Sequence, residues 1–321
     1  MGSWFVGETS LFTQSPARRV ETCNGLIETV RQYCALECSI MQIPEGQNLL
    51  RCGHPLRMKS AAVAALAFLF VAQCSLAEAR AVDEPEANPG RPTVSTPATI
   101  TPVGYLQFET GFLGAWHSSE FSSRESANEV LKFAVSRRFE FLTAVEPFVH
   151  YQRSGEQPEN GTGEVFLGVQ GIVHHGEGAN PTIAVSYFRR IYDGGVPELD
   201  LGSARNSLLL LASADVKGFH YDANAFFNEV IDSGVHRAQF AQTLSISHPL
   251  GHGFTLSGEL WHFTQPFLTS HAVGNLWALG YAVRKNLVLD GGFNRGLTGT
   301  STRWEVFVGF TYLLPYRLLG R

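Results

Sequence analysis

Cysteine is missing from most of this chain. All five cysteines lie between Cys23 and Cys74, and none follows Ala81. The larger part of the chain therefore holds no disulfide framework, zinc ribbon or cysteine nucleophile. The sequence also lacks an apolar run of about 18 residues, the length from which a membrane-spanning helix is recognised.

An excess of basic residues is absent as well. The net charge is −5, whereas a nucleic-acid-binding domain carries a basic patch. We therefore expect no nucleic-acid partner. A hydrophobic content of 44% with 17% charged residues excludes a disordered or collagen-like chain.

A secretion signal is present, but far from the first residue. Met58 and Lys59 precede an unbroken apolar run over residues 61–72, and small-x-small cleavage patterns end at Ala77 and Ala81. This order of charge, short apolar run and small residues predicts a signal peptide over residues 58–81. The alternative is a buried core helix.

The residues in front of this signal have no place in a secreted protein. We expect the biological start to be Met58 and residues 1–57 to be a mis-called upstream extension. Cys34 and Cys38 could form a metal site with Cys52 and His54, but their spacing matches no common zinc module, and chance is the alternative.

After the signal, residues 82–102 are rich in Pro, Ala and Thr and show no periodicity. This composition predicts a flexible tail.

From Val103 onward, apolar and polar residues alternate. In residues 219–228, Phe219, Tyr221 and Phe227 fall on one face, and polar residues such as Asp222 fall on the other. A period of two is typical of β-strands with one apolar face. Similar segments cover residues 105–116, 127–137, 139–152, 162–175, 180–192, 203–217, 235–247, 251–266, 273–284, 286–297 and 303–312.

The connections between these segments are alternately short and long. Arg137-Arg138, Lys217-Gly218 and Lys285-Asn286 are tight, whereas residues 117–127 and 193–202 are longer. A membrane barrel has short periplasmic turns and longer outer loops. Residues 103–321 therefore predict an all-β fold, a transmembrane antiparallel β-barrel of about 12 strands with both termini periplasmic. A soluble β-sandwich with its apolar face inward is the alternative.

The two faces of such a barrel have opposite environments, because lipid contacts the apolar rows and the polar rows line the lumen. Twelve strands predict a narrow lumen, and its excess of carboxylates predicts a mild preference for cations. The expected lumen-lining residues are Gln107, Glu109, Lys132, Glu140, Glu146, Arg190, His220, Asp222, Asn224, Arg237, Glu259, Asp290 and Glu305.

Several short motifs also resemble a known family. Residues 101–109 (TPVGYLQFE) resemble the opening strand of the outer-membrane transporter family named after the MetA-pathway of phenol degradation. Residues 161–170 are similar to its GxGDxxLGxK strand, with Glu164 for Asp and Gln170 for Lys, and residues 294–298 with 304–313 resemble its last hairpin.

The resemblance implies an outer-membrane barrel that passes small compounds, aromatic or hydrophobic ones among them. It carries over no catalytic or ligand residues. Residues 192–195 read Tyr-Asp-Gly-Gly, where the family commonly has a Lys-x-Pro-Thr-Gly loop, and this difference affects ligand preference rather than fold.

Catalytic motifs are absent: the sequence has no GxSxG, HExxH or GxxxxGK pattern, and no GxGxxG opens a helix. We expect no catalytic residue, cofactor or metal. His174 with His175, and His220 with Asp222, could bind a metal, but a solvated turn and a polar lumen explain them as well. His262 is the outward candidate for a lipase-like site and has no matched serine on the adjoining strand.

The sequence thus predicts an outer-membrane transporter or narrow channel for passive uptake of small solutes. The alternatives are a lipase-like hydrolase of the outer membrane and a sealed structural or adhesin barrel. The expected partners are the lipid bilayer, the solute and the outer-membrane assembly machinery.

Overall fold

The computed structural model describes residues 85–197, 199 and 204–319. Their regular structure consists of thirteen antiparallel strands: β1 (Leu106–Trp116), β2 (Ser123–Ala134), β3 (Phe139–Gln152), β4 (Glu159–Gly161), β5 (Val165–His174), β6 (Thr182–Tyr192), β7 (Ala204–Val216), β8 (Phe219–Asp232), β9 (Val235–Gly251), β10 (Phe254–Gln265), β11 (Ser270–Arg284), β12 (Leu287–Gly296) and β13 (Trp304–Leu313). The predicted upstream extension (1–57) and signal peptide (58–81) lie outside the described residues.

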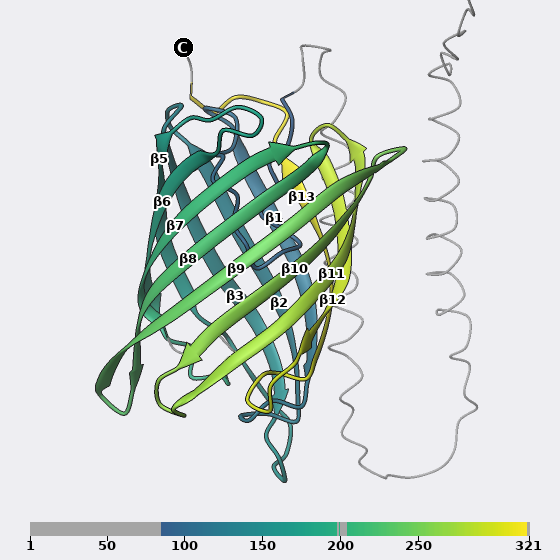
Figure 1. The fold of residues 1–321 in the computed structure, drawn as a ribbon. Helices are drawn as coiled ribbons and strands as arrows, with labels where there is room; N and C mark the ends of the chain where they lie inside the picture. Colours follow the sequence, from purple (N-terminus) through teal and green to yellow (C-terminus); the bar gives the residue numbers. More distant parts are fainter. Residues whose placement is uncertain (1–84, 198, 200–203, 320–321) are drawn as a thin grey trace, which may run out of the picture. The chain divides into compact units, whose positions relative to one another are not determined.

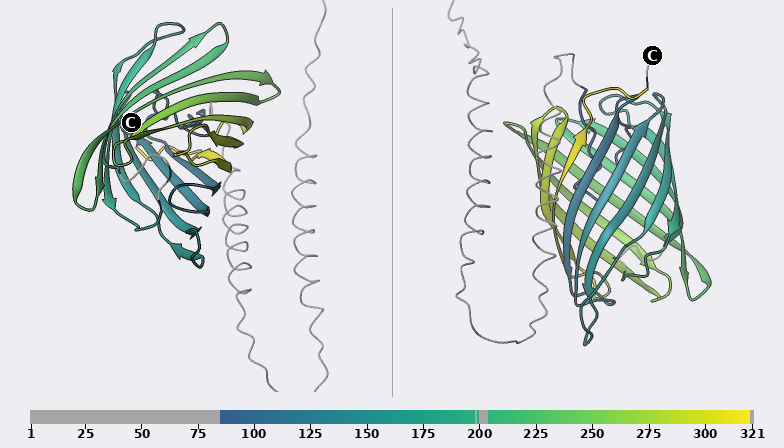
Figure 2. Two further views of the ribbon diagram at one scale, coloured as in Figure 1. Left: turned by 60° about the horizontal axis from the view of Figure 1, so that its bottom comes forward. Right: turned by 180° about the vertical axis from the view of Figure 1, so that it is seen from behind.

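The strands close into a single barrel (Figure 1, Figure 2). Neighbours in the chain pair with one another, and β1 closes the ring by pairing with both β2 and β13. The short strand β4 pairs with the outer part of β3, and β5 pairs with the first part of β3, so these two strands share one position in the wall. The wall is therefore twelve strands around, and the predicted antiparallel barrel is confirmed.

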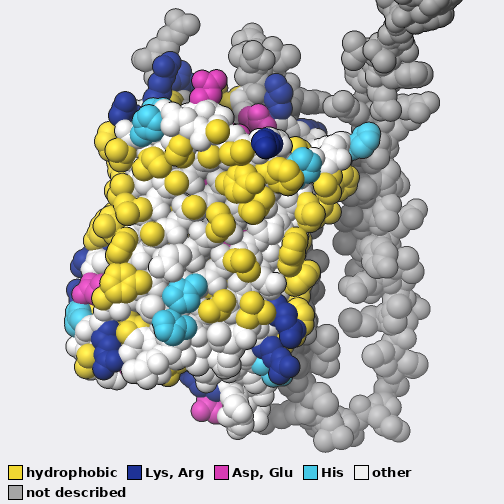
Figure 3. All heavy atoms as spheres, viewed as in Figure 1, with side chains coloured by type: hydrophobic (Ala, Val, Ile, Leu, Met, Phe, Trp, Pro, Cys, Tyr) yellow, Lys and Arg dark blue, Asp and Glu magenta, His cyan; other side chains and the backbone are white. Residues whose placement is uncertain are grey.

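The apolar rows of the strands point outward. Leu260 is 60% exposed and Val308 is 58% exposed, whereas Gln107 and Thr311 are fully buried on the inner side. Figure 3 shows hydrophobic side chains spread over the outer wall. A water-soluble sandwich would bury these rows, so this face meets lipid.

Glu129 is an exception on the outward face, and its carboxylate accepts a hydrogen bond from the Thr110 hydroxyl on the neighbouring strand. No helix among the described residues is long and apolar enough to span a membrane.

The two ends of the barrel differ in their connections. Lys217 and Gly218, with φ angles of 53° and 83°, form the tight turn between β7 and β8, and two positive φ angles suit the twist of a two-residue hairpin. Leu318 N donates to Gly104 O (2.7 Å) and Ala87 N donates to Lys285 O (2.8 Å), so both ends of the described chain lie on this side. Because short turns mark the periplasmic rim, we call this side the periplasmic end and the opposite side the outer end.

The lipid-facing assignment can be tested with Leu260→Arg. A cation at mid-depth on the lipid face should lower the free energy of unfolding in lipid vesicles by about 2–4 kcal/mol. The matched control is Leu268→Arg in the β10–β11 loop, where an exposed leucine lies beyond the strands and the change should be close to zero. Urea titration of tryptophan fluorescence measures both, and equal losses would contradict the assignment.

Candidate functional site

The inner side of the barrel holds many of the charged and polar side chains of the strands. Those that lie against residues 85–102 are Gln107, Glu109, Lys132, Glu140, Asn224, Glu259 and Asp290. Glu305 lines a cavity beside residues 91–94. The other predicted lumen-lining residues lie elsewhere on the inner wall or at its two ends: Glu146, Arg190, His220, Asp222 and Arg237.

Residues 85–102, the N-terminal segment, occupy the lumen. The segment enters at the periplasmic end, where Ala87 N donates to Lys285 O (2.8 Å). It leaves beside β3, where the backbone N–H (2.9 Å) and the hydroxyl of Thr101 both donate to Glu140. The sequence predicts a flexible tail here. The structure differs because the barrel wall supplies the hydrogen-bond partners that the segment lacks within itself.

Glu259 of β10 is the principal acceptor for the middle of the segment. Its carboxylate accepts hydrogen bonds from Val94 N (2.7 Å), Ser95 N (2.7 Å) and Ser95 Oγ (2.6 Å). The Thr243 hydroxyl lies 2.8 Å from Ser95 Oγ and can donate to it, because the single Ser95 hydroxyl proton points to Glu259. A buried carboxylate without donors is costly, and each bond to a charged group contributes about 1.5–3 kcal/mol. The segment and the carboxylate therefore stabilise one another.

Side-chain amides of the wall form hydrogen bonds with the backbone of the segment, as a neighbouring strand would in a sheet. Asn224 accepts from Thr96 N (2.6 Å) and donates to Thr96 O (2.9 Å), so that one side chain satisfies both backbone groups of a residue. Gln170 Nε2 donates to Pro97 O and Thr99 O, both at 3.1 Å. These bonds satisfy backbone groups that would otherwise be orphaned inside the barrel.

Arg91 attaches the segment to β12 of the lumen wall. Its guanidinium bonds Asp290 through Nη2 (3.1 Å) and Nε (3.3 Å), a two-point contact. A Cβ at Gly111 would lie 2.3 Å from Arg91 Nη1, and one at Gly309 would lie 2.7 Å from Nη2. The two glycines of β1 and β13 therefore leave the space that this side chain fills.

Other lumen charges are paired across neighbouring strands. Lys132 Nζ lies 2.5 Å from Glu109 Oε1, and Arg124 Nη2 lies 2.5 Å from Glu146 Oε2. Arg190 pairs with Glu164. Arg124 is not among the predicted lumen-lining residues, because the sequence pattern predicts that this strand begins at residue 127, whereas β2 begins at Ser123. The even spacing between Arg124 and Lys132 would have placed both on one face.

Two predicted residues lie near the ends of the lumen. His220, at the periplasmic end, bonds Asp215 through Nδ1 (2.8 Å) and Asp222 through Nε2 (3.3 Å). Each imidazole nitrogen faces a different carboxylate, and no group of three such side chains in the described part is arranged to hold a metal ion. At the outer end, the Arg237 guanidinium lies 5.0 Å from the ring centre of Phe267.

His262 lies on the outward face, as the sequence predicts, and has two polar neighbours. Its Nδ1 is 3.0 Å from Gln242 Oε1, and its Nε2 is 2.9 Å from Nδ1 of His271. A hydrolase of the serine type would present a hydroxyl to Nε2, and here a second imidazole occupies that position.

The described residues line a larger and a smaller cavity within the barrel. The larger, about 480 Å³, opens at the outer end between the loops, and Val230, Gln239, Gln265 and Phe267 are among its lining residues. The smaller, about 180 Å³, lies between residues 91–94 of the N-terminal segment and the wall. The Oε1 atom of Gln265 is buried and has no hydrogen-bond partner in the described part.

Comparisons with solved structures identify the same architecture. An outer membrane channel from Pseudomonas putida F1 matches with a TM-score of 0.51 and 15% identity, covering 71% of this chain and 100% of that chain. The KdgM porin matches with a TM-score of 0.44 and 12% identity, covering 64% of this chain and 98% of that chain. No protein-family model and no curated protein matches this sequence. The fold is that of an outer-membrane β-barrel, and its apolar outer wall fits that location.

The anchoring role of Glu259 can be tested with Glu259→Ala. Loss of this acceptor leaves Val94 N and both donors of Ser95 unsatisfied, so the segment should open more readily. Hydrogen exchange of the peptide covering residues 90–101, followed by mass spectrometry, should become at least about tenfold faster. Glu229→Ala removes an outward carboxylate of β8 and should leave this peptide unchanged; unchanged exchange in Glu259→Ala would refute the anchoring role.

Proposed function

We propose that this chain is a narrow outer-membrane channel for passive uptake of small solutes and that the N-terminal segment closes it at rest. The observation that carries the proposal is the way the segment is held. The described residues of the segment contact the lumen wall through hydrogen bonds, one ion pair and van der Waals packing. The first residues of the segment lie at the periplasmic end of the barrel, where Ala87 N donates to Lys285 O. Such contacts can be exchanged for water without breaking a covalent bond.

The outer cavity is the proposed entry site for the solute. Its wall combines apolar side chains, Val230 and Phe267, with the amides of Gln239 and Gln265. The Oε1 atom of Gln265 is buried without a hydrogen-bond partner in the described part, whereas its Nε2 donates to Thr300 O at 3.3 Å. This combination favours a small compound with an apolar body and a hydroxyl or amine group. The resemblance to the MetA-pathway family of transporters supports the same class of solute.

The inner wall is the proposed pathway. When the segment leaves, the acceptors that hold it, Glu140, Glu259 and Asp290, would face water in the lumen. Lys132 and Glu109 remain paired with one another at 2.5 Å. The released pathway therefore gains more negative than positive charge, which favours cations and polar neutral solutes over anions.

A sealed structural barrel is the second candidate, because the same segment fills the lumen.

A lipid-face hydrolase is favoured by the contact between His262 and Gln242, which resembles the base and orienting group of a triad. The imidazole that faces His262 Nε2 argues against it, so we propose a transport protein rather than an enzyme. Hydrolysis of a chromogenic ester by the purified barrel, lost in His262→Ala, would favour the hydrolase.

Planar-bilayer conductance tests the channel and its closure together. We expect low conductance for the full chain and a several-fold increase when residues 88–99 are deleted. This deletion removes the part of the segment between Ala87, where it enters the lumen, and Thr101, where it leaves. A synthetic peptide of residues 85–102, added from the periplasmic side, should reduce the conductance of the deleted chain again. Absence of conductance in both chains would support the sealed barrel, and equal conductance in both would show that the segment does not close the lumen.

A further inference from the structure

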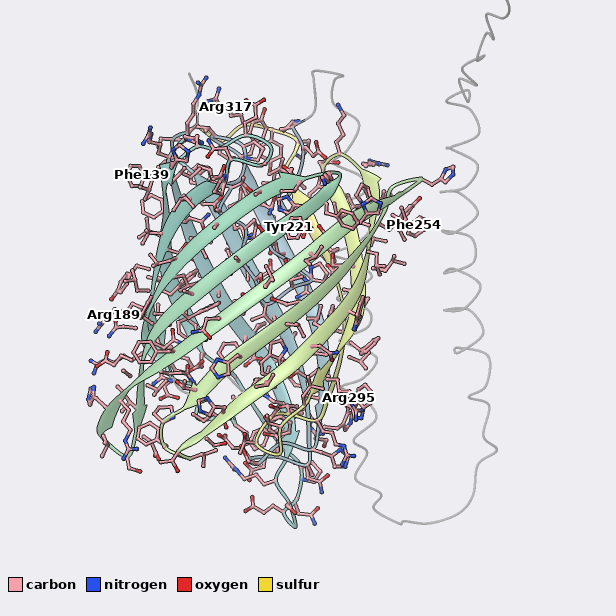
Figure 4. All side chains as sticks on the ribbon, viewed as in Figure 1. Phe139, Arg189, Tyr221, Phe254, Arg295 and Arg317 are labelled. Carbon is pink, nitrogen blue, oxygen red and sulfur yellow. The ribbon has the colours of Figure 1, made fainter. Side chains whose placement is uncertain are left out.

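The lipid-facing surface is chemically different at its two ends. Phe139, Tyr221 and Phe254 lie toward the periplasmic end, whereas Arg189 and Arg295 lie lower in the view, nearer the opposite end (Figure 4). Along β12 the outward positions change from Leu289 and Phe293 to Arg295. Along β10 they change from Leu256 and Leu260 to His262. The apolar belt therefore ends at a polar rim on the outer side.

Arg295 is held on this rim by an aromatic platform. Its guanidinium lies 4.4 Å from the ring centre of Trp304 on β13, and the Trp304 ring packs against Phe293 with 6.2 Å between centroids. Arg295 and Trp304 are directly opposite each other in the β12–β13 register. Stacking fixes the plane of the guanidinium while its N–H donors remain at the edge. In the described part, no carboxylate or carbonyl oxygen accepts a hydrogen bond from the Arg295 guanidinium.

The neighbouring strands add further nitrogen donors and no outward carboxylate. His262 of β10 and His271 of β11 stack with their ring centroids 5.1 Å apart. They share a hydrogen bond, and Gln242 contacts His262. We call Arg295, Trp304, His262 and His271 the rim patch. A cationic group without a counter-charge, at the edge of the hydrocarbon layer, is suited to an anionic headgroup.

Arg189 shows what a self-neutralised site at the same end looks like. Its Nη1 donates to Asn206 Oδ1 (3.2 Å), and Asn206 donates in turn to the Glu229 carboxylate. His236 Nδ1 lies 2.6 Å from the same carboxylate. A phosphate at this cluster would meet the negative charge of Glu229, whereas the rim patch offers no such repulsion.

From these contacts we infer that the rim patch binds the phosphorylated glycolipid headgroup of the outer leaflet. Arg295 would contact a phosphate through two N–H donors, the geometry in which guanidinium recognises phosphate best. Trp304 holds the guanidinium in place and packs against the sugar or acyl chain. This site lies outside the lumen, so lipid binding at the rim patch and conduction through the proposed channel can be tested independently of each other.

Native mass spectrometry of the full chain in detergent tests the inference with lipid A as the probe. Arg295→Gln keeps side-chain size and removes the charge, so the dissociation constant for lipid A should rise about tenfold or more. Arg295→Lys should recover part of the affinity, since it keeps the charge but loses the planar two-point contact. Arg189→Gln is the matched control and should change the dissociation constant by less than about twofold.

Two further arms identify the recognised chemistry. Enzymatically dephosphorylated lipid A should bind the full chain and Arg295→Gln equally weakly. Millimolar inorganic phosphate should not displace lipid A, which separates a lipid site from a site for the free anion. Heat-modifiable migration in gels confirms that each variant is folded. Equal binding of lipid A by the full chain and Arg295→Gln, or an equal loss in Arg189→Gln, would overturn the inference.

Discussion

Buried carboxylates inside a closed, narrow barrel are the constraint on which the rest of this structure depends. Glu140, Glu259 and Asp290 point into a space shielded from bulk water, where an unpaired charge is costly. Each of the three is satisfied by the N-terminal segment, through Thr101, through Val94 and Ser95, and through Arg91 respectively. The lumen is therefore arranged around the segment as much as the segment is arranged within the lumen.

The segment suits this role because it cannot form a strand of its own. Pro89, Pro92 and Pro97 remove backbone donors, so the segment cannot join the wall as a regular strand. The remaining N–H groups find side-chain acceptors on successive strands, including Ser213 Oγ, which accepts from Ala98 N at 2.7 Å. Attachment to side chains on many strands holds the segment without making it part of the barrel.

Much of the barrel is predictable from sequence because the physics of a membrane wall repeats at every second residue. Alternation placed Leu260 outward and Glu259 inward, and turn chemistry at Lys217-Gly218 gave the short end. The position of residues 82–102 could not be read this way, since a Pro/Ala/Thr-rich stretch without periodicity is typical of both a free tail and a lumen segment. A signal was nevertheless present: the inward rows carry more carboxylates than cations, and such a surplus in a narrow lumen requires donors from elsewhere. Arg91, Ser95 and Thr101 are those donors.

Arg124 and Gly111 illustrate a second limit. Arg124 lies before the predicted start of its strand, and the space that Gly111 leaves for Arg91 exists only once β1, β13 and the segment come together. Contacts between segments far apart in the chain depend on register and depth, which local patterns do not specify.

The central claim, that the N-terminal segment closes a conducting lumen, is tested most directly by locking the segment in place. Ser95 and Thr243 place their hydroxyl oxygens 2.8 Å apart, so the double variant Ser95→Cys, Thr243→Cys can form a disulfide. The background is a chain whose five native cysteines are replaced by serine. Single-channel recording of the double variant should show conducting events under reducing conditions and none after oxidation. The conductance of the single variant Ser95→Cys should be the same under both conditions. Conductance that persists after complete oxidation would contradict the account.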